Sequence, residues 1–505
     1  MIQRFTKFIT GLLSSRKFII VIVGLLIIQA VWLAFTVQFP MAFDESYHFG
    51  IIQVYAHQWL PFITTEPAGA SGFGVITRYD SYMFHYLMSF PYRLFALFSS
   101  DWASQIIFLR LIDIALFASG LVLFQRLLIR FKVSRALVHF TLLMFVLIPV
   151  VPTLAATINY DNLMFFLVPI ITGLTLTCIS SINKKQTIPA SSFILLLSVG
   201  FIGSLTKYAF VPIFAGALLA LLIVWLRSYK RKQIIASIMT SYKALGRPTQ
   251  IILTLFLVIS TGLFIERYVG NLVMYQRFEP DCTQVKSLES CLTYGPWGRN
   301  YQLESNVETN DPPYDPHVAA YPFYWVSELI RKLYFTINYD FQEYAPLPIP
   351  IAVAWVIGSI GTILTIIFWR SITLLDKRLL LLTPIIGLYL AGLFYETFIA
   401  FLKFHTAVAV NGRYLIPILP FILIWLGLAY RQFFQAILRR HASQFIAIFS
   451  VVILLLALQG GGAMTYLLRS QPIWYWQYQP LVDFNTSLKG IIKPFIIDTN
   501  DSSPQ

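Results

Sequence analysis

The stretch Phe18–Gly50, FIIVIVGLLIIQAVWLAFTVQFPMAFDESYHFG, joins a long apolar run to two adjacent acidic residues. The apolar part, Phe18–Thr36, is long enough for a helix that crosses about 30 Å of hydrocarbon. Asp44, Glu45 and His48 follow it closely, so we expect them at a membrane surface. A carboxylate at that boundary costs desolvation energy unless it is solvated or paired. The stretch therefore predicts a membrane helix followed by a polar site.

The rest of the chain repeats the apolar pattern. Hydrophobic residues make up 57% of the 505 residues and charged residues 12%, whereas soluble domains have about 25% charged residues. The sequence therefore predicts an all-α, polytopic membrane protein. Hydropathy indicates about eleven transmembrane helices, near residues 18–37, 104–126, 136–152, 160–181, 190–206, 208–227, 250–268, 349–369, 379–400, 412–430 and 445–467.

The net charge of +14 is a topology signal rather than a sign of nucleic-acid binding. Lys and Arg are concentrated at the N-terminus and in the loops after the even-numbered predicted spans. This asymmetry predicts a multi-pass plasma-membrane protein with a cytoplasmic N-terminus and an outer C-terminus. The apolar run within residues 1–36 is expected to be a retained anchor rather than a signal peptide, because it is long and lacks a small-x-small cleavage pattern.

The loops suggest how the chain is organised. We expect a transmembrane domain over residues 1–470, with a first outer loop at 38–103 and an outer cap loop at 268–348, and an outer tail at 471–505. Asp44–Leu60 and Tyr79–Phe98 are predicted as amphipathic helices lying along the membrane interface. The cap loop is rich in Pro, Tyr and Asn and is predicted to be irregular. The region around Lys207 fits either one broken helix or two spans.

Three cysteines are present. Cys282 and Cys291 lie close together in the outer cap. The outer side of the membrane is oxidising, so we expect a disulfide between them rather than two free thiols. Cys178 falls inside a predicted span and is interpreted as a packing residue. No pattern of His and Cys indicates structural zinc.

The acidic pair is the leading candidate for chemistry. Asp44 and His48 are four residues apart, so on a helix they share a face, and Glu45 points about a quarter turn away. A carboxylate in this position could act as a general base or as a metal ligand. The alternative is a structural role, with Asp44 capping a helix and Glu45 favouring its positive N-terminal dipole. Both roles can hold at once.

Several segments together resemble a known superfamily. An acidic pair after the first span, followed by interfacial helices, is similar to the GT-C superfamily of membrane glycosyltransferases. That superfamily includes the protein O-mannosyltransferases and the aminoarabinose transferase of lipid A. The Pro-Pro-aromatic segment common in the second interfacial helix of the family is missing here. The other segments that carry the resemblance are Tyr79–Leu87, Leu109–Asp113, Ala156–Asp161, Leu205–Tyr208 and Asn411–Pro417.

The resemblance implies transfer of a sugar from a polyprenyl-phosphate donor to a lipid, glycan or protein acceptor at the outer face. Asp44 matches the family's base, and inversion follows from in-line attack. Glu45 would support Asp44 or help to bind a cation. Some relatives need a divalent cation and others do not, so a cation at Asp44 and Glu45 stays open. The substrate-binding candidates are His48, Asp80, His85, Arg110, Asn159, Asp161, Lys207, Tyr208, His405, Arg413 and Tyr414.

Most of these candidates also have a structural interpretation. Lys207 could snorkel to the interface, and Arg413 could anchor a span there, next to Gly412, which would allow close backbone approach. Arg110 and Asp113, three residues apart, are expected to form an ion pair. The remaining structural interpretations are helix capping for Asn159 and Asp161 and surface solvation for Lys403 and His405. Trp297 and Trp325 are aromatic residues of the outer cap that could stack on sugar.

Convergence would favour the transferase. Asp44, Lys207 and Arg413 are distant in the sequence, and a transferase needs them in one outer-facing cavity. Two other functions stay open. A transporter or lipid flippase would be expected to show related halves and charged or broken helices near the bilayer midplane, and a non-catalytic envelope assembly protein would need no turnover.

Overall fold

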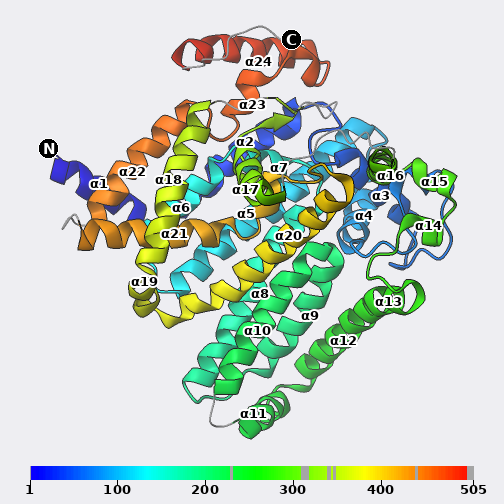
Figure 1. Cartoon of the computed structure of the whole chain (residues 1–505), viewed down its shortest axis with the longest axis horizontal. Coiled ribbons are helices and arrows are strands. Elements are labelled where there is room, and N and C mark those ends of the chain that lie inside the picture. Colours follow the sequence, from blue (N-terminus) through cyan, green and yellow to red (C-terminus); the bar gives the residue numbers. More distant parts are fainter. Residues whose placement is uncertain are drawn as a thin grey trace.

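The computed structural model describes residues 2–227, 231–308, 318–337, 343–344, 348–437 and 442–496. These residues are helical almost throughout (Figure 1). The strands in this described part are two residues long, β1 (Thr336–Ile337) and β2 (Glu343–Tyr344), and they pair antiparallel. The predicted all-α class is confirmed.

Seven helical segments are long and apolar enough to cross a membrane. A helix of about 20 residues spans about 30 Å, so this criterion depends on length and composition alone. An eighth candidate is the bent pair α6 (Arg135–Val146) and α7 (Val150–Ala156), which meet at 73°. The seven segments are α2 (Phe18–Thr36), α5 (Trp102–Arg130), α8 (Tyr160–Asn183), Tyr208–Arg227, Arg247–Tyr275, Ile349–Ile367 and Lys377–Phe404.

The structure does not establish the predicted count of about eleven spans. The apolar helices α9 (Ala190–Thr206) and α22 (Ala442–Leu458) are 17 residues long, below the usual spanning length. The predicted span 412–430 is divided between the short helix η6 (Gly412–Leu415) and α21 (Leu419–Ala436). The region around Lys207 forms two helices, because α9 ends before Lys207 and α10 (Val211–Arg227) follows the single turn η2 (Tyr208–Phe210).

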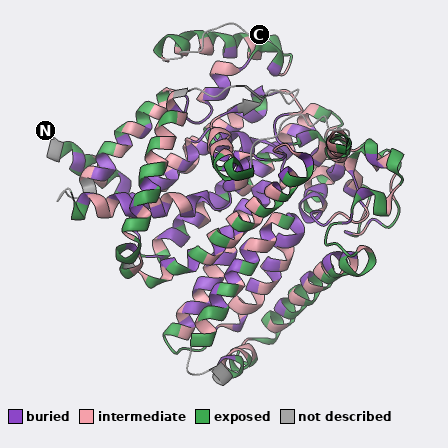
Figure 2. Ribbon diagram, viewed as in Figure 1, coloured by how far each residue is buried: buried purple, intermediate pink, exposed green. Residues whose placement is uncertain are grey.

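The core is formed where the central helices touch closely. α5 lies against α8, and a Cβ on Gly120 would come within 2.8 Å of the Phe165 ring. The missing side chain therefore allows Phe117 and Phe165 to stack with ring centroids 4.1 Å apart. α9 and α10 both pack on α8, and the buried residues concentrate in these central helices (Figure 2). Dense apolar packing thus holds the ends of α5, α8 and α10 in fixed positions.

The outer helices expose apolar surface. α12 (Arg247–Phe264) packs on α9 along one side and is otherwise largely exposed (Figure 2). Its exposed side chains include Ile251, Ile252, Leu255 and Val258. A helix that is apolar on its exposed face suits a hydrocarbon environment better than water. This surface agrees with the membrane character expected from composition.

Two helices lie in the segment after α2, as predicted. α3 (Glu45–Ala56) and α4 (Met83–Ala96) pack on one another, and α4 also touches α5. One turn of 3-10 helix, η1 (Ala70–Phe73), lies between them. α4 exposes Leu87, Phe90 and Leu94, an apolar face of the kind that interfacial helices bury in lipid. These two helices position the acidic pair beside the starts of α5 and α8.

The predicted irregular cap at 268–348 was wrong for the described residues, which form short helices. Local capping explains two of them: Asp281 and Gln284 form a capping box, and Ser287 caps the next helix. Cys282 and Cys291 form a disulfide with their Cα atoms 5.8 Å apart. Residues 309–317, 338–342 and 345–347 of this segment lie outside the described part. The helices are α13 (Gly270–Tyr275), α14 (Cys282–Val285), α15 (Leu288–Leu292), α16 (Gly295–Glu308), η4 (Val318–Ala320) and α17 (Tyr321–Arg331).

Cys178 is buried in α8 as a free thiol. The predicted tail 471–505 contains one longer helix, α24 (Gln479–Ile492), between two short 3-10 helices, and residues 497–505 lie outside the described part. Trp32 Nε1 donates to Asn485 Oδ1 at 3.0 Å and joins α24 to α2. The other elements are α1 (Ile2–Ser14), α11 (Arg231–Lys243), η3 (Ile265–Val269), α18 (Pro348–Ile367), α19 (Trp369–Leu375), η5 (Lys377–Leu381), α20 (Leu382–Phe404), α23 (Met464–Arg469), η7 (Pro472–Trp474), α24 (Gln479–Ile492) and η8 (Lys493–Phe495).

Candidate functional site

Asp44 is held at a sharp turn between α2 and α3. Phe43 and Asp44 have φ values of 65° and 64°, in the left-handed region that costs energy for residues other than glycine. Asp44 occupies the N-cap position of α3, but its side chain makes no capping hydrogen bond. The carboxylate instead forms an ion pair with Arg413, with Oδ2 2.9 Å from Nη2. The Asp44 side chain is 55% exposed, so it meets both a cation and solvent.

Glu45 points the other way and is completely buried. Arg110 donates from Nε and Nη2 to the two carboxylate oxygens, each at 2.7 Å. The backbone N–H of Met41 donates to Oε2 at 2.6 Å, and that of Ile158 to Oε1 at 3.3 Å. Arg110 also donates to the carbonyl oxygens at the end of α2. With both oxygens occupied and no exposed surface, Glu45 has no position left for a substrate hydroxyl or a metal ion.

The expected ion pair between Arg110 and Asp113 was wrong. Arg110 turns toward Glu45, and Asp113 accepts from the backbone N–H of Asn159 at 3.3 Å. The reason is tertiary, because the end of α2 and the start of α3 offer Arg110 a bidentate carboxylate and two carbonyl oxygens. Guanidinium matches that set better than a single neighbour on its own helix. The sequence spacing could not show this choice.

Arg413 is fixed in place by its neighbours in the chain. A Cβ on Gly412 would lie 2.5 Å from the backbone N of Leu333, so glycine lets η6 lie against the end of α17. Asn411 caps this turn by accepting from the Arg413 N–H at 3.0 Å. The guanidinium is 5.0 Å from the centroid of the Phe43 ring and 5.2 Å from that of Tyr414. The close approach predicted for Gly412 therefore positions Arg413.

The Arg413 guanidinium is only partly satisfied. Its side chain is 7% exposed, and Nη2 donates to Asp44. Nε and Nη1 are buried, and neither finds a hydrogen-bond acceptor in the described part of the chain. A buried donor without an acceptor is costly, so these two N–H groups indicate a place where an anionic ligand would be stabilised.

Lys207 forms a second ion pair close by. Its Nζ lies 2.6 Å from Asp161 Oδ1, and its side chain is 5% exposed. The ammonium also lies over two rings, 4.5 Å from the centroid of Tyr160 and 4.8 Å from that of Tyr414. Lys207 is therefore paired inside the protein, and the interpretation that it snorkels to the interface was wrong. Asp161 Oδ2 has no hydrogen-bond partner among the described residues, so this oxygen can still accept a hydrogen bond.

The three distant residues lie close together, while the outer-facing cavity that all three were expected to line stays a prediction. Asp44 touches Arg413, and both Lys207 and Arg413 lie against Tyr414. Three chain segments therefore meet at one end of the helix bundle, called here the Asp44 end. Two cavities elsewhere in the described residues are lined by other side chains. The contact of the cluster with solvent depends on the exposed carboxylate of Asp44.

Asn159 links the two ion pairs. It is the N-cap of α8 and accepts from the Asp161 N–H at 2.9 Å, so the capping interpretation applies to it. Its Nδ2 also donates to the carbonyl oxygen of Phe43 at 2.8 Å. One side chain thus ties the turn that carries Asp44 to the helix that carries Asp161.

His48 and His85 form a buried pair beside this cluster. Their Nδ1 and Nε2 atoms are 2.8 Å apart, and the His48 ring is 4.5 Å from that of Tyr160. Burial lowers the pKa of His85 to about 3 and places the pKa of His48 well below its usual range. Both rings are therefore neutral at physiological pH. The two rings pack near Tyr160, on which Lys207 lies, and they carry no charge.

The remaining candidates lie around this centre or away from it. Asp80 is buried and accepts from Ser81 Oγ at 2.9 Å, and the same hydroxyl accepts from the Tyr208 N–H at 3.0 Å. Burial raises the pKa of Asp80 to about 6. His405 makes no contact with Asp44 in the described residues, and its neighbour Lys403 pairs with Glu304 at the surface. His405 therefore stays outside the cluster.

Two contributors were missed by sequence reasoning. Tyr160 lies under Lys207, and the only signal for it was its place between Asn159 and Asp161. Glu279 is an exposed residue, and desolvation together with the nearby charge of Asp80 raises its pKa to about 8. Nothing in its own segment indicated that position. The tryptophans of the cap contact protein rings: Trp297 stacks on Tyr301 and Trp325 packs on Phe394.

The described residues contain no group of three His, Cys, Asp or Glu side chains that could hold a metal ion. Asp44 and Glu45, the pair considered for a cation, are each bound by an arginine. Arginine already neutralises these carboxylates, so the pair as arranged here does not fit a divalent cation.

No family model, no curated protein and no solved structure matches this chain.

Proposed function

We propose that this protein is a membrane glycosyltransferase that moves a sugar from a polyprenyl-phosphate donor to an acceptor hydroxyl, with Asp44 as the base. One observation carries the proposal. The guanidinium of Arg413 holds the exposed carboxylate of Asp44 through Nη2, while its buried Nε and Nη1 have no acceptor in the described structure. An anion bound to these two N–H groups would lie next to the base.

The second cation supports the same geometry. Lys207 and Arg413 both lie against the Tyr414 ring, and the Lys207 partner Asp161 has one oxygen unused. Negative charge builds on the phosphate oxygens as the phosphate departs. Two fixed cations beside the phosphate stabilise this charge more than water does. Phosphate oxygens suit a guanidinium fork, and Lys207 would add a point charge.

The reaction follows from this placement. Asp44 accepts the proton of the acceptor hydroxyl as its oxygen forms a bond to the anomeric carbon. The bond from that carbon to the phosphate oxygen breaks on the opposite face, and its electron pair leaves with the polyprenyl phosphate. Arg413 and Lys207 stabilise the departing charge, and the sugar is inverted. Glu45 and Arg110 keep the Asp44 turn in position and take no proton.

The site would face the outer side of the membrane, following the charge asymmetry of the loops. A polyprenyl chain would lie along lipid-exposed helices, and the apolar face of α4 next to the cluster suits that environment. The acceptor would approach from water, where Asp44 is exposed.

The test is transfer by purified protein supplied with a panel of polyprenyl-phosphate sugars. Asp44→Asn should lower turnover about 100- to 10,000-fold, the usual contribution of a positioned base, while donor binding persists because the Arg413 and Lys207 donors remain. Asp483→Asn, an equal charge change on exposed α24, is the matched control and should keep full activity. Full activity of Asp44→Asn, or no transfer from any donor by the native protein, would contradict the proposal.

A further inference from the structure

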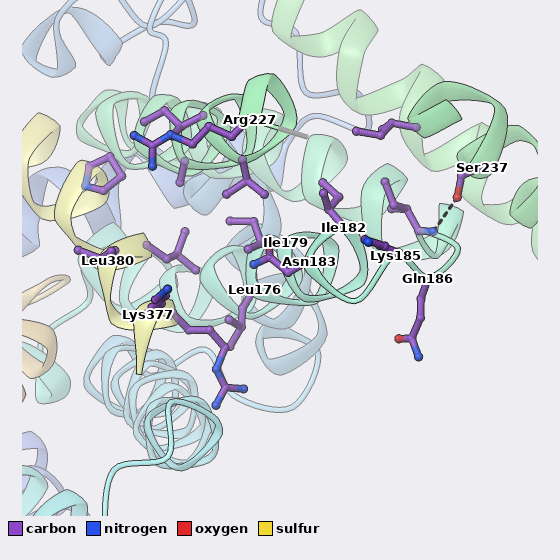
Figure 3. Close-up of a pocket in the computed structure, with 18 of the residues that line it drawn as sticks. Leu176, Ile179, Ile182, Asn183, Lys185, Gln186, Arg227, Ser237, Lys377 and Leu380 are labelled. Carbon is purple, nitrogen blue, oxygen red and sulfur yellow. Dashed lines mark hydrogen bonds between the residues drawn. The ribbon is translucent and has the colours of Figure 1, made fainter. Parts of the chain in front are cut away.

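A large cavity lies at the end of the bundle remote from Asp44. Its volume is about 1050 Å³, and its walls come from the C-terminal halves of α8 and α10, from α11, and from the α19–η5–α20 region (Figure 3). α8 runs from Asp161 near the Asp44 cluster to Asn183 at the cavity. At 1.5 Å per residue those two positions are about 33 Å apart, close to the thickness of a hydrocarbon core. The cavity and the Asp44 cluster are therefore at opposite faces of the predicted membrane.

The cavity is lined by cations without matching acids. Four basic residues line it, and the lining residues include no Asp or Glu. Between Asp161 and Glu266, which covers α8 to α12, the sequence has no acidic residue at all. Arg378 is paired with Asp376. The other three cations, Lys185, Arg227 and Lys377, form no ion pair within the described residues.

These three cations border an apolar wall. Figure 3 shows Arg227 and Lys377 on one side and Lys185 on the other, with Leu176, Ile179 and Ile182 of α8 between them. The wall continues through Ile223 and Val224 of α10 and Leu380 of η5. Ile223 and Leu380 are about two-fifths exposed, so the wall reaches the surface of the bundle.

Neutral polar groups complete the lining. Asn183, Gln186, Thr187 and Thr240 offer amide and hydroxyl donors, and Ser237 Oγ accepts from the Ile188 N–H at 2.9 Å (Figure 3). That bond fixes the loop after α8 against α11. A cavity bordered by cations and neutral donors around an apolar wall has the polarity of an amphiphile with an anionic headgroup.

We propose that this cavity binds an anionic phospholipid, with its phosphate held by the cations at the rim, Arg227 and Lys377 on one side or Lys185 on the other, and an acyl chain along α8 and α10. Three unpaired cations favour an anion over a zwitterionic headgroup, whose own ammonium would be repelled. The apolar wall favours a lipid over a soluble phosphate. The site is separate from the proposed transfer site, and its occupancy does not depend on that activity.

The test compares lipid binding by the purified full chain in detergent, measured by native mass spectrometry with added phosphatidylglycerol or phosphatidylcholine. We expect phosphatidylglycerol to bind at least about tenfold more tightly. The triple variant Lys185→Gln/Arg227→Gln/Lys377→Gln should lose at least about tenfold of that affinity. The matched control Lys243→Gln/Arg247→Gln/Arg370→Gln removes three exposed cations that do not line the cavity, and it should bind as the native protein does.

A second variant keeps the charges and fills the space. Ile223→Trp should weaken phosphatidylglycerol binding because the larger ring occupies the apolar wall, and it keeps the test valid if the triple variant fails to fold. Equal binding of both lipids, or an equal loss in the control triple variant, would overturn the proposal. Displacement of bound phosphatidylglycerol by millimolar inorganic phosphate would overturn the assignment to a lipid.

Discussion

Asp44 and Glu45 are adjacent in the chain, and the structure gives them opposite environments. Glu45 is buried, with Arg110 on both oxygens and two backbone N–H groups beside it. Asp44 is 55% exposed and receives one bond from Arg413, whose other donors are unused. A fully satisfied buried pair holds structure together, whereas an exposed carboxylate beside a partly satisfied cation is available for chemistry. Of these two adjacent carboxylates, Asp44 is therefore the one that can accept a proton from a substrate.

The largest expected effect comes from breaking the buried pair. Arg110→Ala should destabilise the protein by about 3–5 kcal/mol, because Glu45 would be left as a buried charge without a partner. Thermal unfolding in detergent measures this loss. The matched control is Arg126→Ala, an exposed arginine on the same helix, which should change stability by less than about 0.5 kcal/mol. Equal stability of the two variants would remove the contrast between the acidic neighbours.

A third carboxylate sharpens the comparison, since Asp80 is buried without a cation bonded to it. Burial raises the pKa of Asp80 from 3.8 to about 6. Between these pH values the folded protein keeps a proton that the unfolded chain has released, so stability should fall as pH rises from about 4 to about 6 and stay lower above that. The loss is roughly 3 kcal/mol at most.

Melting temperatures between pH 4 and pH 8 check this dependence. Asp80→Asn should flatten the curve between pH 4 and pH 6 and raise stability at neutral pH, because amide burial carries no ionisation cost. Glu279, whose pKa is raised from 4.5 to about 8, adds its own fall in stability between about pH 4.5 and pH 8, so the Asp80→Asn curve keeps a shallower slope over that range. A curve unchanged by Asp80→Asn would show that the titration belongs to other groups.

Arg413→Lys tests the unused donors next to Asp44. The substitution keeps the charge and removes the guanidinium fork, so polyprenyl-phosphate donor affinity should fall about tenfold, which corresponds to about 1.4 kcal/mol. Binding of radiolabelled donor to purified protein measures it. Arg299→Lys in the cap is the exposed control. Unchanged affinity for Arg413→Lys would mean that the two N–H groups do not face the phosphate.

The smallest effect is expected for the stability of Asp44→Asn. The Asp44 carboxylate is 55% exposed, and the amide of Asp44→Asn keeps an oxygen that can accept from Arg413, so the melting temperature should stay close to that of the native protein. Glu45→Gln is the adjacent comparison and should melt clearly lower, because it weakens the two charge-assisted bonds from Arg110. If both variants melted alike, the two carboxylates would share one structural role.

Much of the architecture followed from composition and periodicity. The helical class and the helices after the first span were predictable because apolar run length and spacing are local properties. The number of spans was not, since helices such as α9 and the bent pair α6–α7 fall near the length limit. The short helices of the cap were missed because Pro, Tyr and Asn also fit loops, and capping by Asp281 and Ser287 decided the outcome.

Composition and hydropathy were enough to predict an apolar helical protein with an acidic pair after its first long helix. The sequence also identified Lys207 and Arg413 as cations worth explaining. Only the tertiary structure decided that Glu45 would take Arg110 and that Asp44 would take Arg413. The physical reason is that a side chain's partner depends on which distant backbone and charged groups surround it. The Glu45–Arg110 pair is buried where α2, α3 and α5 meet, so its role is structural. The Asp44 carboxylate lies at an exposed turn, so it can still meet a substrate.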